Sequence, residues 1–127
     1  MRKFLIVLFC VCLLSGCGEE KNTNKDNNTV SYMEAKEKII NDGAILLDVR
    51  TEDEYNESHI EGASLLPLDE IEEDKISAIV NSKDIPIIVY CKSGNRSHEA
   101  LLKLQELGYS KVYDLGAMSN WKSSREN

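Results

Sequence analysis

Two long apolar runs stand out in the hydrophobic pattern of the chain, at residues 44–49 and 85–90. Runs of this kind, with almost no polar alternation, are typical of strands that are buried on both faces of a parallel sheet. Shorter strands are expected at 64–66 and 111–115, and Val30 is expected to end another. The pattern therefore predicts a central sheet with two buried strands and shorter partners.

Amphipathic segments between these strands carry signals of helix starts. Ser31 with Glu34, and Thr51 with Glu54, have the spacing of a capping box, in which a hydroxyl and a carboxylate satisfy the free amides of the first helical turn. We therefore expect one helix to follow Ser31 and end at Gly43, and a short polar helix to follow Thr51.

Two further helices are predicted, at about 69–81 and from Ser97 to Gly108. Their inward-facing apolar positions are Ile76, Ile79 and Val80 in the first, and Ala100, Leu101, Leu104 and Leu107 in the second. Strands that alternate with helices predict an α/β fold, a mainly parallel sheet between two layers of helices. In such open sheets, functional sites lie at the carboxyl ends of the strands.

The first 17 residues have the pattern of a targeting sequence rather than of an element of this fold. Two cationic residues precede an apolar segment of eleven, at 4–14, which is the length of a signal peptide and too short to span a bilayer. The sequence that ends at Cys17 resembles the bacterial lipobox. We expect residues 1–16 to be a cleaved signal peptide and Cys17 to carry lipid; a plain signal peptide or a short uncleaved anchor is the alternative.

A polar stretch follows, and it predicts a tether. Residues 18–28 contain no apolar side chain, a composition that cannot bury enough surface to become ordered. We therefore expect a lipidated cysteine and flexible tether at 17–28, a folded domain at 29–127, and a location on the extracytoplasmic face of a membrane, at the cell surface or in the periplasm.

The charge of the chain restricts its partners. The full chain carries a formal net charge of −7, and removal of the signal peptide leaves 13 basic and 22 acidic residues, or −9. An acidic domain of this kind does not favour nucleic acid as a partner, nor attachment to anionic lipids by charge alone.

The cysteines divide in the same way. Cys10 and Cys12 would leave with the signal peptide and Cys17 would carry lipid, so that Cys91 is the single thiol of the mature domain. One thiol and two scattered histidines do not have the spacing of metal ligands, and we expect neither a metal nor another cofactor. A buried core cysteine is the simplest reading of Cys91, but its sequence context favours a functional one.

That context is a polar loop between a buried strand and a helix. Cys91 is followed by Lys92, Ser93, Gly94, Asn95, Arg96 and Ser97. Cationic side chains and a helix N-terminus both stabilise a thiolate. A glycine lets successive N–H groups turn inward as an anion-binding nest. The loop is thus suited to an anionic sulfur and to an oxyanion that approaches it.

From about Ser31 to Lys122 the sequence resembles the single-domain rhodaneses. The likeness rests on four blocks in order, at 47–50 with 54–55, at 59–63 with 66–68, at 89–97, and at 107–109 with 112–116 and Trp121. The resemblance implies that Cys91 takes sulfur from a donor such as thiosulfate, becomes a persulfide held by the loop amides, and passes the sulfur to a thiol or cyanide acceptor. It implies that Lys92 and Arg96 position the anionic donor.

Other residues are expected to support this site. Asp48 and Arg50 match positions that look structural in the family, so we expect them to form an ion pair or hydrogen-bonded brace beneath the site. We expect His59 to be a residue of a turn rather than a general base. His98 is expected on an exposed helix face. One departure concerns residues 116–118, Gly-Ala-Met, where the family usually carries two glycines and an apolar residue. This difference is expected to alter the pocket or the choice of acceptor.

Three other functions compete with sulfur transfer. Phosphatases of this fold have five residues between Cys and Arg, whereas four separate Cys91 from Arg96. A thioredoxin-like oxidoreductase needs a second cysteine near the first. A persulfide carrier or a protein-binding module without turnover is the serious alternative, and it implies a protein partner on the same membrane face.

Overall fold

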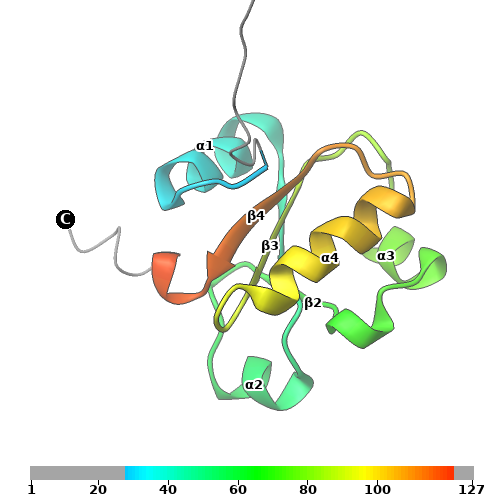
Figure 1. Ribbon diagram of the computed structural model, residues 1–127. Coiled ribbons are helices and arrows are strands. Elements are labelled where there is room, and N and C mark those ends of the chain that lie inside the picture. Colours follow the sequence, from blue (N-terminus) through cyan, green and yellow to red (C-terminus); the bar gives the residue numbers. More distant parts are fainter. Residues whose placement is uncertain (1–27, 122–127) are drawn as a thin grey trace, which may run out of the picture.

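The computed structural model describes residues 28–121, which form a four-stranded parallel sheet in the order β2-β1-β3-β4 (Figure 1). The strands are β1 (Ile45–Asp48), β2 (Ser64–Leu65), β3 (Ile87–Cys91) and β4 (Val112–Ala117). The two longest predicted runs, β1 and β3, pair in the centre, and every residue of β3 is buried. The predicted parallel sheet is confirmed.

Helices cover both faces of this sheet (Figure 1). They are α1 (Tyr32–Asp42), α2 (Glu52–Glu57), a 3-10 turn η2 (Leu68–Glu70), α3 (Glu73–Ile79) and α4 (Asn95–Glu106). Because side chains alternate along a strand, Ile87 and Val89 pack with α3 and α4, whereas Ile88 and Tyr90 pack with α1. Two cores result, one on each face, and the three-layer α/β fold is confirmed.

Both predicted capping boxes are present. The Ser31 hydroxyl accepts from the Glu34 amide at 3.2 Å, and the Glu34 carboxylate accepts from the Ser31 amide at 2.9 Å. Thr51 and Glu54 form the same pair at the start of α2. Short local signals therefore fixed where α1 and α2 begin.

The helix predicted at about 69–81 is confirmed only over α3, because the segment divides into η2 and α3. Between them Ile71 is extended and buried. Ile71 and Ile76 both pack into the core of the α3–α4 face. Five positions apart on one continuous helix, they would point in directions about 140° apart. Breaking the helix at Ile71 lets both side chains reach the same core.

The chain enters the domain along the edge strand β4. The Asp114 amide donates to the Asn28 carbonyl at 2.7 Å, and the Val30 amide donates to the Asp114 carbonyl at 3.0 Å. The strand expected to end at Val30 is thus an isolated parallel bridge between Thr29 and Asp114. These bonds cover part of an otherwise open edge of the sheet.

The signal peptide, Cys17 and nearly all of the predicted tether lie outside the described residues. Within residues 28–121, no helix has the length and apolar character needed to cross a bilayer.

Candidate functional site

Cys91 ends β3, and its sulfur lies inside the loop that follows. The side chain is fully buried. Its Sγ accepts hydrogen bonds from the backbone amides of Gly94, at 3.0 Å, and Ser97, at 3.2 Å. Both donors point at one atom, so the loop provides a cradle that stabilises negative charge on sulfur.

The start of α4 explains this cradle. The helix begins at Asn95, two residues before the predicted start at Ser97, and Gly94 is its N-cap with φ of 104°. Gly94 has no side chain to accept from the free amides of the first turn, which are usually satisfied by an N-cap oxygen. The Cys91 sulfur takes that place, since the Ser97 amide is the third of the helix. The Ser97 hydroxyl instead donates to the Gly94 carbonyl at 3.2 Å.

Arg96 faces a carboxylate rather than open solvent. Its two terminal nitrogens donate to the two oxygens of Glu54 at 2.8 and 3.1 Å, and the two side chains are 33% and 26% exposed. These hydrogen bonds, with one from the Thr51 amide, lower the pKa of Glu54 to about 2. Glu54 raises the pKa of Arg96, and Cys91 acts on it in the same direction. The pair joins α2 to the loop.

Asp48 and Arg50 form the second ion pair of this region. The Asp48 carboxylate accepts from Arg50 Nε at 2.9 Å and from Arg50 Nη2 at 2.7 Å. The Tyr90 hydroxyl donates to the same carboxylate at 2.7 Å, while Arg50 Nη2 also donates to the Ser58 carbonyl at 2.7 Å. Burial raises the pKa of Tyr90, so its hydroxyl keeps the proton that it donates. The expected brace thus has this geometry, with Tyr90 as a third member.

The remaining predicted residues lie around the cradle and the brace. His59 is exposed, stacks on the Tyr55 ring at 3.7 Å, and its Nδ1 lies 2.8 Å from the Tyr55 carbonyl. It therefore belongs to the turn after α2. The side chains of Lys92, Ser93 and Asn95 are exposed, and within the described part of the chain none has a hydrogen-bond partner. His98 is exposed on α4.

A cleft of about 430 Å³ lies beside the loop. The residues of this loop-side cleft are Arg50, Glu54, Glu57, Ser58, Lys92, Met118 and Ser119. The Met118 amide donates to the Cys91 carbonyl at 2.8 Å, which fixes the cleft wall to the end of β3. Met118 keeps the apolar character that is usual in the family, and the residue that departs from the family sequence, Ala117, pairs with Cys91 at the end of β4.

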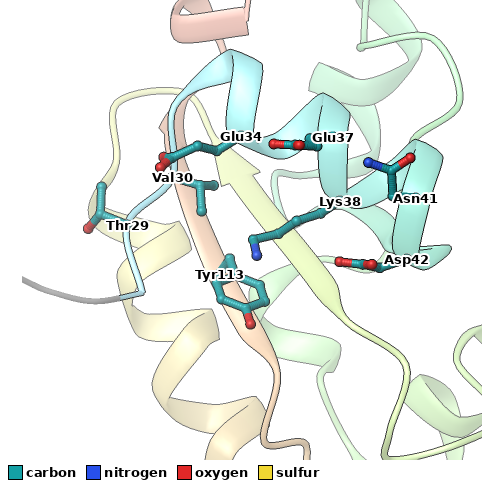
Figure 2. Close-up of a pocket in the computed structure, with 8 residues that line it drawn as sticks. All are labelled: Thr29, Val30, Glu34, Glu37, Lys38, Asn41, Asp42 and Tyr113. Carbon is teal, nitrogen blue, oxygen red and sulfur yellow. The ribbon is translucent and has the colours of Figure 1, made fainter.

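A second cavity, of about 370 Å³, lies between α1 and β4 and shares no residue with the loop (Figure 2). The Lys38 ammonium lies 4.1 Å from the centre of the Tyr113 ring within it. This cation already occupies the aromatic face. The candidate site is therefore the Cys91 loop with its adjoining cleft.

Residues 31–124 match the family described as the rhodanese-like domain. The chain belongs to the rhodanese-like family. The match covers nearly all of the described residues, and the predicted resemblance to the rhodaneses is confirmed.

Named relatives agree with this assignment. The chain is 35% identical to the thiosulfate sulfurtransferase PspE of Escherichia coli, over 58% of this chain and 70% of that protein. It is 34% identical to the thiosulfate sulfurtransferase GlpE of Coxiella burnetii, over 74% of this chain and 86% of that one. A Bacillus subtilis relative named as a putative sulfur carrier protein, YrkF, is 33% identical over 86% of this chain and 59% of its own length.

Solved rhodanese-like structures share the fold. An E. coli rhodanese with anions is 32% identical, with a TM-score of 0.57 over 61% of this chain and 89% of that one. The human single-domain sulfurtransferase TSTD1 is 25% identical, with a TM-score of 0.64 over 76% of this chain and 96% of that one. The family and the fold of this rhodanese-like domain therefore agree.

Two features of this rhodanese-like site were not predicted as such. Glu54 was assigned to a capping box and a family block, not to Arg96, and Tyr90 was treated as part of an apolar run. The pairing of the strands is the information that would have predicted both contacts. Because β1 and β3 are neighbours in register, with Asp48 opposite Tyr90, the segments that follow their carboxyl ends, α2 and the Cys91 loop, lie side by side.

Within residues 28–121, no cluster of three His, Cys, Asp or Glu side chains could hold a metal ion. The chemistry that the site offers is that of a single cradled sulfur. A buried sulfur with two convergent amides suits a nucleophile that carries negative charge before and after it reacts.

Proposed function

We propose that this rhodanese-like domain is a sulfurtransferase. It moves sulfane sulfur from a donor such as thiosulfate to a thiol or cyanide acceptor through a persulfide on Cys91. The observation that carries the proposal is the pair of amide hydrogen bonds from Gly94 and Ser97 to the Cys91 sulfur. The relatives named thiosulfate sulfurtransferases support the same chemistry.

The reaction has two displacements. The Cys91 thiolate attacks the outer sulfur of thiosulfate, a new S–S bond forms, the S–S bond of thiosulfate breaks, and sulfite leaves with the electron pair. The acceptor then attacks the outer sulfur of the persulfide, and the electron pair returns to Sγ. In the thiolate the negative charge lies on Sγ, where the amides of Gly94 and Ser97 stabilise it before the donor is attacked and after the sulfur is passed on. In the persulfide the charge lies on the outer sulfur.

The cations of the loop have different parts in this proposal. Lys92 is exposed at the loop-side cleft and is available to attract an anionic donor. Arg96 is already paired with Glu54, so its charge is largely compensated. Donor binding therefore depends on Lys92 and the loop amides more than on Arg96.

A persulfide carrier without rapid turnover is the second candidate. Two observations favour it: the full burial of Cys91, and the relative named as a putative sulfur carrier protein. The two candidates differ in rate rather than in the intermediate. Co-purification of a protein partner that depends on the domain surface but not on Cys91 would favour a binding role.

We also propose that the domain is a membrane-anchored lipoprotein on the extracytoplasmic face, lipidated at Cys17. The support is the sequence of residues 1–28, with its cationic start, short apolar segment and polar tether. Expression in bacteria with a labelled fatty acid should label the wild-type protein and not the Cys17→Ser variant. Equal labelling of both would contradict this proposal.

Thiocyanate formation from thiosulfate and cyanide tests the enzymatic proposal. The full chain in neutral detergent should form thiocyanate, and the Cys91→Ser variant should form none above background. The variant replaces one sulfur atom with oxygen, and circular dichroism would confirm that it is folded. A folded wild type with reduced Cys91 and no thiocyanate would remove thiosulfate as the donor and favour the carrier.

A further inference from the structure

The loop-side cleft contains four ionisable side chains, and two of them are already paired. Arg50 is held by Asp48, and Glu54 is held by Arg96. The other two, Glu57 and Lys92, are exposed and have no ion-pair or hydrogen-bond partner within residues 28–121. The cleft therefore presents one available anion and one available cation.

These two charges lie on opposite elements of the cleft. Lys92 directly follows Cys91 in the loop. Glu57 is the last residue of α2, followed by Ser58, also in the cleft, as its C-cap. Arg50 already binds the Ser58 carbonyl at this helix end, at 2.7 Å, so the free anionic group there is the Glu57 carboxylate. The α2 end of the cleft thus favours a cation, and the loop end favours an anion.

The cleft also adjoins the sulfur loop at two points. Met118, in its wall, donates its amide to the Cys91 carbonyl at 2.8 Å. Glu54, also in its wall, binds Arg96 in the first turn of α4. A molecule in the cleft therefore lies against the segment that carries the proposed persulfide.

We infer that the loop-side cleft binds a zwitterionic thiol, of the amino-acid type, as the sulfur acceptor. Its carboxylate would pair with Lys92 and its ammonium with Glu57, and its thiol would meet the sulfane sulfur. The inference rests on the proposed function, because it needs a persulfide at Cys91. It explains why the wall carries one free charge of each sign.

The transfer is balanced without any further reactant. The acceptor thiolate attacks the outer sulfur of the Cys91 persulfide, and an S–S bond forms between them. The bond between this sulfur and Cys91 Sγ breaks, and its electron pair stays on Sγ. The products are the amino-acid persulfide anion and the Cys91 thiolate, which the Gly94 and Ser97 amides hold.

The test starts from the full chain in neutral detergent, loaded with sulfur from thiosulfate. Release of thiocyanate by cyanide first measures how much persulfide is present. The loaded protein is then mixed with L-cysteine, with N-acetyl-L-cysteine, which lacks the ammonium, or with L-cysteine ethyl ester, which lacks the carboxylate. The rate of persulfide loss is measured for each. Each thiol is compared between variants, so that its own reactivity cancels.

The variants Glu57→Gln and Lys92→Gln remove one charge each. With Glu57→Gln, the ratio of the rate with L-cysteine to that with N-acetyl-L-cysteine should fall by about twofold to fivefold, as expected for an exposed ion pair. With Lys92→Gln, the ratio of L-cysteine to its ethyl ester should fall by a similar factor. High salt should reduce both effects.

Two matched controls separate a local contact from a general effect of charge. Glu52→Gln makes the same change on the same helix outside the cleft, and Lys111→Gln removes an exposed lysine elsewhere; both should keep the wild-type ratios. Ratios that do not change in either cleft variant, or that change equally in the controls, would overturn the inference. Failure of sulfur loading in the wild type would instead contradict the proposed function.

Discussion

Two ion pairs lie at the carboxyl end of the sheet, and they differ in how completely the protein encloses them. Asp48 and Arg50 are 0% and 6% exposed, and the Asp48 carboxylate also accepts from Tyr90. Glu54 and Arg96 remain 26% and 33% exposed. Asp48 is fully buried and Arg50 is nearly so, so a member of this pair that loses its partner gains little solvation, whereas the second pair can exchange its partner for water. The first is thus suited to hold the fold, and the second to adjust the loop.

The largest effect is expected when the buried pair is broken. Asp48→Asn leaves the Arg50 guanidinium buried without its counter-charge, and we expect a loss of about 3–5 kcal/mol in the free energy of unfolding. Urea denaturation measures it. The double variant Asp48→Asn with Arg50→Met removes both charges and should recover part of this loss. A loss below about 1 kcal/mol in the single variant would contradict the structural role of the pair.

A smaller effect is expected from the glycine of the cradle. A Cβ on Gly94 would meet no atom within 4 Å, so Gly94→Ala is costly only because φ is 104°. We expect about 1–2 kcal/mol of destabilisation. We also expect Gly94→Ala to form the persulfide more slowly than the wild type. The reason is that relief of this backbone strain moves the Gly94 amide away from the Cys91 sulfur. The measurements are urea denaturation and the rate of sulfite release from thiosulfate.

Gly62→Ala is the matched control for this change. Gly62 has φ of 90° and equally open space, but it lies in the turn before β2. The backbone cost should be similar, and the rate of sulfite release should stay at the wild-type value. Equal rates in the two glycine variants would show that the Gly94 amide has no part in the reaction.

The smallest effect on stability is expected at the exposed pair. The pKa of Glu54, about 2 in the fold, lies below the value of about 4.3 in an unfolded chain. The pair therefore stabilises the fold fully above about pH 4.3, and this contribution is lost as the pH falls towards 2. Because both side chains are partly exposed, we expect Glu54→Gln to cost about 0.2–1 kcal/mol at pH 7 and less at low pH.

Glu34→Gln separates the ion pair from the capping box. Glu34 closes the box of α1 as Glu54 closes that of α2, but only Glu54 binds an arginine. Unfolding measured between pH 2 and 7 should show a reduced acid dependence in Glu54→Gln and a smaller change in Glu34→Gln. The same pH dependence in both variants would assign the effect to the box alone.

Local signals explain what the sequence predicted well. The capping boxes at Ser31 and Thr51 involve residues three apart, and the apolar runs of β1 and β3 need only burial on both faces. The cysteine loop was found because a polar, glycine-containing segment follows a buried strand. Each of these features is contained in a few consecutive residues, so no knowledge of the packing was needed.

The features that the sequence did not predict depend on neighbours in space. Ile71 interrupts a predicted helix because it fills a position in the core that α4 helps to form. This position could not be predicted without the packing of α4. The start of α4 was predicted at Ser97, whereas the helix begins at Asn95 and the Cys91 sulfur, which is distant in the local pattern, accepts the Ser97 amide. The Glu54–Arg96 pair could be predicted only with knowledge of the strand order, which brings α2 beside the Cys91 loop.

The central claim is that the cradled sulfur of Cys91 accepts a sulfur atom, and mass spectrometry tests it most directly. After incubation of the reduced protein with thiosulfate, the intact chain should gain the mass of one sulfur atom, and the peptide that contains Cys91 should carry it. Cyanide should remove the added mass, and the Cys91→Ser variant should gain none. A folded, reduced wild type that gains no sulfur, or a gain that persists in the variant, would contradict the account.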